Sequence, residues 1–253
     1  MSPALSLSRR RILQAGTLAA FTATTPQLFA AESASGRLTV RHQQTTTVTT
    51  PGEHVLDDNN GRRAILYVPP AYNAATPAPF MMMLHGARGD GDRTLESQRA
   101  AADEHGVVLL CPSTRSGTWD AIQGDFAHDL KKLDVLLAQV FERCNIDPVR
   151  IASGGFSDGA SYALSLGLIN GDFFTHIIAH SPGFIISDTR QGKPDVYVSH
   201  GHQDEVLPFD RCGAAIVAKL EREGYAPRFD VFDGGHAASP ELRSAALAWL
   251  TRK

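Results

Sequence analysis

The residue in this chain best suited to nucleophilic chemistry is a serine between two glycines. Residues 155–159 read GFSDG and fit the pattern G-x-S-x-G, with Ser157 at the centre. The apolar run 150–154 before it is typical of a buried strand, and residues 160–168 after it have helical periodicity. A sharp turn between them would lift the Ser157 hydroxyl above the sheet, where only glycine fits on either side. The pattern predicts a nucleophile, with a space-saving Gly/Ser turn as the alternative.

A serine hydroxyl needs a base to remove its proton and an acid to hold that base. In an open parallel sheet such groups belong in loops at the carboxyl ends of strands. Two predicted strand ends carry them, in HGHQDEVLP at 200–208 and DGGH at 233–236. We therefore predict Asp204 as the acid and His236 as the base. Other carboxylates that could replace Asp204 are Asp188, Asp233 and, less well placed, Glu205.

A further strand end can supply hydrogen-bond donors for a developing oxyanion. The loop HGA at 85–87 follows the apolar run FMMML, and its most suitable donor is the backbone amide of Ala87. The amide of Asp158, where the helix after Ser157 begins, would face it. Two such donors are each worth roughly 3 kcal/mol of barrier. This convergence of strand ends predicts acyl transfer from a carbonyl to Ser157 and then to water.

Other side chains near the expected cleft have less specific interpretations. Trp119 is a candidate for lining the acyl or alcohol site, against ordinary packing in its loop. His85 is expected to shape the oxyanion loop rather than to transfer protons, and the carboxylate of Asp158 is expected to be solvated. Arg88 and Arg115 could meet an acidic substrate, although a solvated surface role is the stronger expectation.

The elements that must position these groups alternate between strand and helix. Apolar runs predict strands at 80–84, 107–111, 150–154, 176–180, 195–199 and 228–232, and helical patterns separate them at 94–105, 125–143, 160–168, 210–223 and 240–250. Residues 37–50 and 63–68 predict an antiparallel edge, with a turn at Pro51 and Gly52. We expect an α/β fold whose mostly parallel central sheet has helices on both faces. The short connection from 181 to 195 predicts an open cleft without a large lid.

These features together resemble the α/β-hydrolase fold, and more narrowly esterases of the polyhydroxybutyrate-depolymerase-like or phospholipase/carboxylesterase-like kind. The segments that carry the resemblance span most of the chain from residue 80 onwards: LHG (84–86), GGFSDGASYALSLGL (154–168), HSPGF (180–184), SHGHQDEVLP (199–208) and GGHAASPE (234–241). The resemblance implies the triad of Ser157, Asp204 and His236, the same oxyanion donors, and hydrolysis of short-chain carboxylic esters, polyesters or feruloyl esters. Few cysteines and no appended substrate-binding domain make solid polymer a less suitable substrate.

Other kinds of function remain open at this point. The segment HGHQD at 200–204 fits an H-x-H-x-D core, so His200, His202 and Asp204 could ligate a metal, but Glu205 stands where such sites want another histidine. A secreted carbohydrate- or polymer-binding protein would keep the fold without hydrolysis, and an acyltransferase would use the same residues with an alcohol as the second acceptor. We expect hydrolysis of a small-molecule or oligomeric ester, with no metal and no cofactor.

The N-terminus predicts export from a bacterial cell. Residues 8–14 read SRRRILQ, which is similar to a twin-arginine signal but departs from it at Ile12 and Gln14. The stretch 15–30 is mildly apolar, too short and too rich in threonine to span a membrane. We expect a signal peptide at 1–31 that meets the export machinery, one domain at 32–253, a periplasmic or secreted location, and no stable membrane anchoring. A disordered basic start on a cytoplasmic protein is the alternative.

Composition narrows the remaining partners. The 253 residues are 43% hydrophobic and carry a formal net charge of −3, an ordinary globular composition. Because there is no basic block, we expect no nucleic-acid partner. The three cysteines, Cys111, Cys144 and Cys212, cannot all pair, and we expect buried or semi-buried thiols with at most one bridge.

Overall fold

The protein is built on one central sheet. The computed structural model describes residues 36–45, 47–56, 63–124, 126 and 128–252; the predicted signal peptide at 1–31 therefore lies outside the described residues. The described strands form an eight-stranded sheet of order β1-β2-β4-β3-β5-β6-β7-β8. Its strands are β1 (Gly52–Leu56), β2 (Ala64–Val68), β3 (Ala78–Leu84), β4 (Val108–Cys111), β5 (Ile146–Phe156), β6 (His176–His180), β7 (Asp195–Gly201) and β8 (Arg228–Phe232). Only the β1–β2 and β2–β4 pairs are antiparallel, so the predicted mostly parallel sheet is confirmed.

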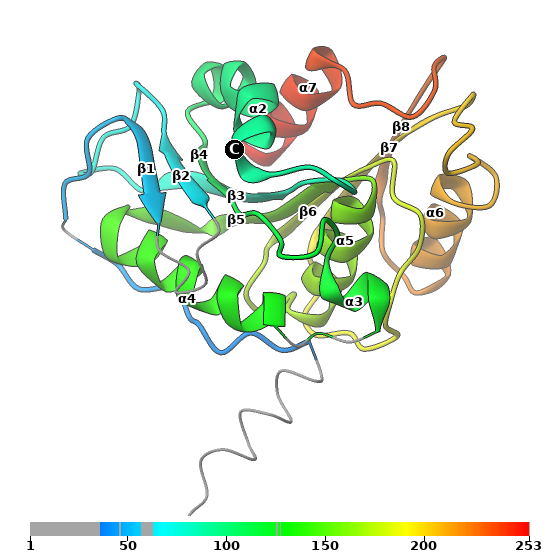
Figure 1. The fold of residues 1–253 in the computed structure, drawn as a ribbon, viewed down its shortest axis with the longest axis horizontal. Coiled ribbons are helices and arrows are strands. Elements are labelled where there is room, and N and C mark those ends of the chain that lie inside the picture. The colour runs from blue at the N-terminus through cyan, green and yellow to red at the C-terminus, as the bar shows by residue number, and fades with distance from the viewer. Residues whose placement is uncertain (1–35, 46, 57–62, 125, 127, 253) are drawn as a thin grey trace, which may run out of the picture.

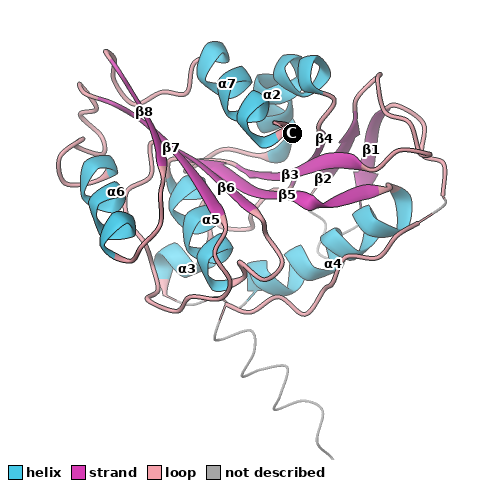
Figure 2. Ribbon diagram, turned by 180° about the vertical axis from the view of Figure 1, so that it is seen from behind, coloured by secondary structure: helices cyan, strands magenta, loops and turns pink. Residues whose placement is uncertain are grey.

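Helices cover both faces of this sheet (Figures 1 and 2). Helices α2 (Gly91–His105) and α7 (Pro240–Leu250) lie side by side on one face. Helices α3 (Asp120–Gln123), α4 (His128–Arg143), α5 (Asp158–Ile169) and α6 (Gly213–Arg222) lie on the other.

Alternation along the inner strands explains why they read as continuous apolar runs. On β6, Ile178 packs into the cluster beneath α7, whereas Ile177 packs against α5 and α6. On β7, Tyr197 and Val198 divide between the same two faces. Successive side chains of a strand point to opposite faces, so a sheet covered on both sides needs apolar residues at every position. The sheet is thereby a rigid support for the loops at its strand ends.

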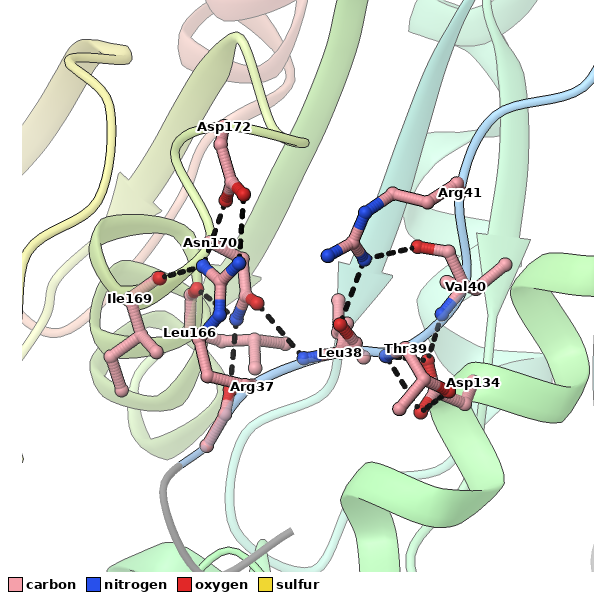
Figure 3. A network of polar contacts seen from close by, with 11 residues as sticks. Arg37, Leu38, Thr39, Val40, Arg41, Asp134, Leu166, Ile169, Asn170 and Asp172 are labelled. Carbon is pink, nitrogen blue, oxygen red and sulfur yellow. Dashed lines mark hydrogen bonds and ion pairs between the residues drawn. The ribbon is translucent and has the colours of Figure 1, made fainter. Parts of the chain in front are cut away.

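The predicted strand at 37–50 is wrong. None of the described residues in that range belongs to a strand, and the edge strand β1 begins at Gly52, where a turn was expected. Instead the segment lies across α4 and α5, and helix side chains bind its backbone (Figure 3). The amide of Leu38 donates to Asn170 Oδ1 over 2.9 Å, and the amide of Thr39 donates to Asp134 Oδ1 over 2.9 Å. These side-chain acceptors replace the ladder that a strand would need.

Two other elements differ from the sequence prediction, namely β5 and α3. β5 begins at Ile146, earlier than expected, and the short helix α3 lies where a loop was predicted. β6 and β7 are joined by residues 181–194, a segment without a helix.

The three cysteines are buried free thiols, and burial raises the pKa of Cys144 to about 11. No helix among the described residues is both long and apolar enough to cross a bilayer.

Candidate active site

Ser157 stands alone between a strand and a helix. β5 ends at Phe156 and α5 begins at Asp158, and Ser157 takes a positive φ of 57°. A non-glycine residue held in such a sparsely populated region costs about 1–3 kcal/mol, which the surroundings must offset. The backbone is held in place by a hydrogen bond from the Ser157 amide to the carbonyl of His180, at 3.0 Å.

The two glycines of the motif are required by close backbone approach, as the sequence predicted. A Cβ on Gly155 would lie 2.2 Å from the carbonyl oxygen of Gly159. A Cβ on Gly159 would lie 2.3 Å from the carbonyl oxygen of Leu84, at the end of β3. Because these neighbours are backbone atoms that cannot rotate away, the turn excludes side chains at both positions. The tight turn lets Ser157 project from the end of the sheet.

The structure brings Ser157, His236 and Asp204 into one hydrogen-bonded chain. His236 Nε2 lies 2.9 Å from Ser157 Oγ, and His236 Nδ1 lies 2.7 Å from Asp204 Oδ2. The carboxylate can only accept at neutral pH, so Nδ1 carries the proton and Nε2 is free to accept the serine proton. Asp204 follows β7 and His236 follows β8, the strand ends that the sequence singled out. This is the geometry of a nucleophile, a base and an acid that orients the base.

Asp204 is an ionised acid with no side-chain exposure. Burial works against the charge, but amide hydrogen bonds from Leu207 and Val206 and the contact with His236 outweigh it, and the pKa of Asp204 is lowered. The Leu207 and Val206 amides both donate to Oδ1, at 2.8 and 3.0 Å, whereas Oδ2 lies 2.7 Å from His236 Nδ1 and 3.3 Å from His200 Nε2. Two carboxylates considered as rivals lie at the surface: Asp188 is bound to Lys219, and Asp233 is 93% exposed beside His202.

The loop after β3 lies directly against the nucleophile. A Cβ on Gly86 would come within 3.2 Å of the Ser157 Cβ. The backbone amides of Ala87 and Asp158, the predicted oxyanion donors, make no hydrogen bond within the described part of the chain. The Asp158 amide is one of the free donors at the start of α5. Its carboxylate, expected to be solvated, instead accepts from Thr118 Oγ1 over 2.6 Å, which ties the start of α5 to the loop before α3.

His85 and Trp119 stabilise the loop that follows β3 and contains Ala87. His85 Nε2 accepts from the amide of Thr114 at 3.1 Å, so the ring is neutral and its Nδ1 donates to the carbonyl of Gly86 at 2.7 Å. Trp119 is fully buried, and its indole donates to the carbonyl of His85 at 2.9 Å. The expectation that Trp119 lines the substrate site is therefore wrong, because it has no surface to offer a substrate. It supports the oxyanion loop, as the ring contact of 4.9 Å with His85 also shows.

The H-x-H-x-D segment does not form a metal-binding cluster. The His202 side chain is 54% exposed and its Nδ1 lies 3.8 Å from Asp233 Oδ1, whereas His200 is buried with Nε2 at 2.7 Å from the carbonyl of Leu207. Among the residues that the structure describes, no group of three or more histidine, cysteine, aspartate or glutamate side chains could hold a metal ion. β7 ends at Gly201, so His200 belongs to the strand and His202 to the turn that follows it.

Comparison with known proteins agrees with this architecture. No protein-family model matches the chain. A solved S-formylglutathione hydrolase from Staphylococcus aureus superposes with a TM-score of 0.65 at 14% identity, covering 79% of this chain and 99% of that one. The chain has the α/β-hydrolase fold. A ferulic acid esterase from Anaeromyces mucronatus shares this hydrolase fold, with a TM-score of 0.63 at 15% identity and coverage of 78% and 89%. By sequence, feruloyl esterase C from Emericella nidulans is 26% identical over 222 residues, which covers 75% of this chain and 81% of that protein.

Sequence reasoning missed two side chains at this site. The ring of Phe156 packs on the imidazole of His236, with centroids 4.9 Å apart, and so holds the base in place. Thr118 binds the carboxylate of Asp158. Phe156 occupies a variable position of the G-x-S-x-G pattern, so its position beside the nucleophile was the available signal. No local sequence signal indicated the role of Thr118, because its partner Asp158 is 40 residues further along the chain.

Proposed function

We propose that this protein is a serine esterase that hydrolyses carboxylic esters through an acyl-enzyme on Ser157. One observation carries the proposal: the continuous chain from Ser157 Oγ through both nitrogens of His236 to Asp204, with contacts of 2.9 and 2.7 Å. The similarity to a feruloyl esterase at 26% identity supports an ester rather than another acyl substrate.

Each group has a distinct role in the proposed reaction. His236 Nε2 takes the proton of Ser157 as Oγ attacks the ester carbonyl, and Asp204 stabilises the imidazolium that results. The amides of Ala87 and Asp158 bind the oxyanion, and both are free to do so. The tetrahedral intermediate collapses, the C–O bond to the alcohol breaks, and His236 returns the proton to the leaving oxygen. Water then repeats the sequence on the acyl-enzyme and releases the acid.

The substrates we propose are short-chain, feruloyl-type or hydroxyalkanoate-type esters. The segment from β6 to β7 contains no helix that could act as a lid, which suits small or oligomeric soluble esters. Exposed apolar side chains, Phe184 and Val206, lie in the loops that follow β6 and β7 and provide a surface for an acyl or aryl group.

Turnover of p-nitrophenyl esters from acetate to palmitate tests this proposal. We expect kcat/KM to fall as the acyl chain lengthens, and feruloyl esters to be cleaved. The Ser157→Ala variant should lose measurable turnover while keeping its fold by circular dichroism. Full activity in that variant would refute the acyl-enzyme, and turnover lost only to a chelator would point to a metal instead.

We also propose export to the periplasm or beyond through the signal at 1–31. The packed body supports a cleavage near residue 30, because Leu38 already belongs to the core and the carbonyl of Gly36 binds Asn170 Nδ2. Cell fractionation and N-terminal sequencing of the full chain, against a variant with Arg9 and Arg10 replaced by lysine, test this. An unprocessed cytoplasmic protein in both cases would contradict it.

A further inference from the structure

A cavity of about 330 Å³ opens beside the oxyanion loop, between the starts of α2 and α7. One wall is the loop from His85 to Asp90, and the wall nearest the triad contains Phe156 and Ala238. Phe156 precedes the nucleophile and packs on His236, and Ala238 follows His236 by two residues. The volume is at the lower end of the range for small-molecule sites. A substituent on an ester bound at Ser157 can therefore reach this cavity.

The lining of this cavity is positively charged. Its lining residues include three arginines, Arg88, Arg93 and Arg243, and one acidic residue, Asp90. Asp90 already accepts from the amide of Arg93 at 2.8 Å and lies 3.8 Å from the guanidinium Nε of Arg93. Arg88 is exposed, and its side chain has no hydrogen bond or ion pair within the described part of the chain.

Arg243 is a half-buried cation without a carboxylate partner. Its Nη1 donates to the carbonyl of Ser97 at 3.0 Å, and it forms no ion pair with any described residue. Burial lowers the pKa of Arg243, and the nearby charge of Glu241 only partly opposes this. Half-burying a cation without a counter-ion is costly unless something binds it. An anion entering the cavity would supply the missing partner.

Gln98 adds a neutral group to the same cavity. It is 2% exposed and lines the cavity from α2, yet its side-chain amide has no hydrogen-bond partner among the described residues. Its amide atoms keep some exposure to the cavity, so a ligand bound there can reach them. An amide that can donate beside an unpaired guanidinium is a combination that recognises a carboxylate.

We propose that this cavity binds a carboxylate carried by the ester substrate, so that the enzyme favours esters of dicarboxylic or hydroxycarboxylic acids. The inference rests on the proposed esterase function and specifies its substrate class. Arg243 and Gln98 bind the carboxylate oxygens, and Arg88 contributes charge at the cavity mouth. The carboxylate lies a few bonds from the scissile carbonyl, because the cavity adjoins the oxyanion loop.

Kinetics on matched ester pairs test this proposal. The acyl-side pair is p-nitrophenyl hemiglutarate and p-nitrophenyl pentanoate, in which a carboxylate replaces a methyl group. The alcohol-side pair is 3-acetoxybutanoate and its methyl ester, followed by pH-stat. We expect Arg243→Gln to lower kcat/KM for the carboxylate member of one pair by about 10–100-fold, the scale of a charge-assisted hydrogen bond, and to change the neutral member by less than about threefold. The pair that responds shows which side of the ester carries the carboxylate.

Two further variants keep the test decisive. Arg88→Gln, at an exposed position whose side chain makes no hydrogen bond or ion pair with a described residue, should lower the same ratio by a smaller factor. Arg222→Gln, an exposed arginine on α6 at the other face of the sheet, should leave the ratio unchanged. Equal losses on both members of each pair, or no change in either ratio, would overturn the carboxylate site while leaving the esterase intact. No turnover of any of these esters by the wild-type protein would overturn both.

Discussion

Two polar networks in this protein differ in what they leave unsatisfied. The segment at 36–41 is fastened to α4 and α5 by a network whose buried groups are all paired, since Asn170 binds Gly36, Leu38 and Leu166 at once (Figure 3). The network of Ser157, His236 and Asp204 ends instead on a hydroxyl in a strained turn, beside two amides without acceptors.

The difference shows how one fold separates stability from chemistry. A satisfied network lowers the free energy of the native state, whereas donors held ready without a partner raise it and are useful only when charge develops in front of them. Strain and unpaired donors at a strand end are therefore signs of function. Substitutions in the network of Ser157, His236 and Asp204 should therefore lower activity, whereas substitutions in the network around Asn170 should lower stability.

The largest expected effect is on turnover. Asp204→Asn should lower kcat by about 10³–10⁴-fold, because an amide no longer selects the tautomer in which His236 Nε2 accepts the serine proton. The measurement is kcat on p-nitrophenyl acetate. Asp233→Asn is the matched control, since Asp233 is also close to the end of β8 but is 93% exposed, and it should change kcat by less than about twofold. Equal losses in the two variants would contradict the assignment of the acid.

The intermediate effect is on stability. Asn170→Ala should lower the free energy of unfolding by about 2–3 kcal/mol, because it leaves the Leu38 amide and the Gly36 carbonyl without partners. Urea denaturation measures this, and kcat should not change at temperatures where both proteins are folded. Asp172→Asn weakens the partly exposed ion pair with Arg37 and should cost less than about 1 kcal/mol. A loss of kcat in folded Asn170→Ala would remove the separation between the networks.

The smallest effect is on the way in which the free energy of unfolding depends on pH, through the carboxylate of Asp204. Because the pKa of Asp204 is lowered, its ionised form stabilises the fold above the ordinary aspartate pKa near 4, and this contribution disappears as the pH falls through the lowered value. The stability difference between wild type and Asp204→Asn should be constant around neutral pH and shrink in acid. Urea denaturation at pH 7 and at progressively lower pH checks this. A difference that grows in acid would contradict the direction of the pKa shift.

Local patterns in the sequence predicted the parts of the molecule that depend on local chemistry. The continuous apolar runs indicated a sheet covered on both faces, and the spacing of Gly155 and Gly159 indicated the tight turn. The position of Asp204 and His236 at strand ends indicated how they would meet. The strand predicted at 37–50 failed because β-branched composition does not reveal whether another strand or a helix side chain satisfies the backbone. The prediction that Trp119 lines the substrate site failed for a related reason. Its burial depends on Tyr162, a residue on α5 that is distant in the sequence.

Labelling with a fluorophosphonate tests the central claim most directly. The reagent phosphonylates a serine only where a base removes its proton and an oxyanion site accepts the phosphoryl oxygen. Intact mass and peptide mapping should show one adduct, on Ser157, and none in His236→Ala. No adduct on the wild-type protein, or an equally fast adduct on another serine, would contradict the claim that this triad makes Ser157 a nucleophile.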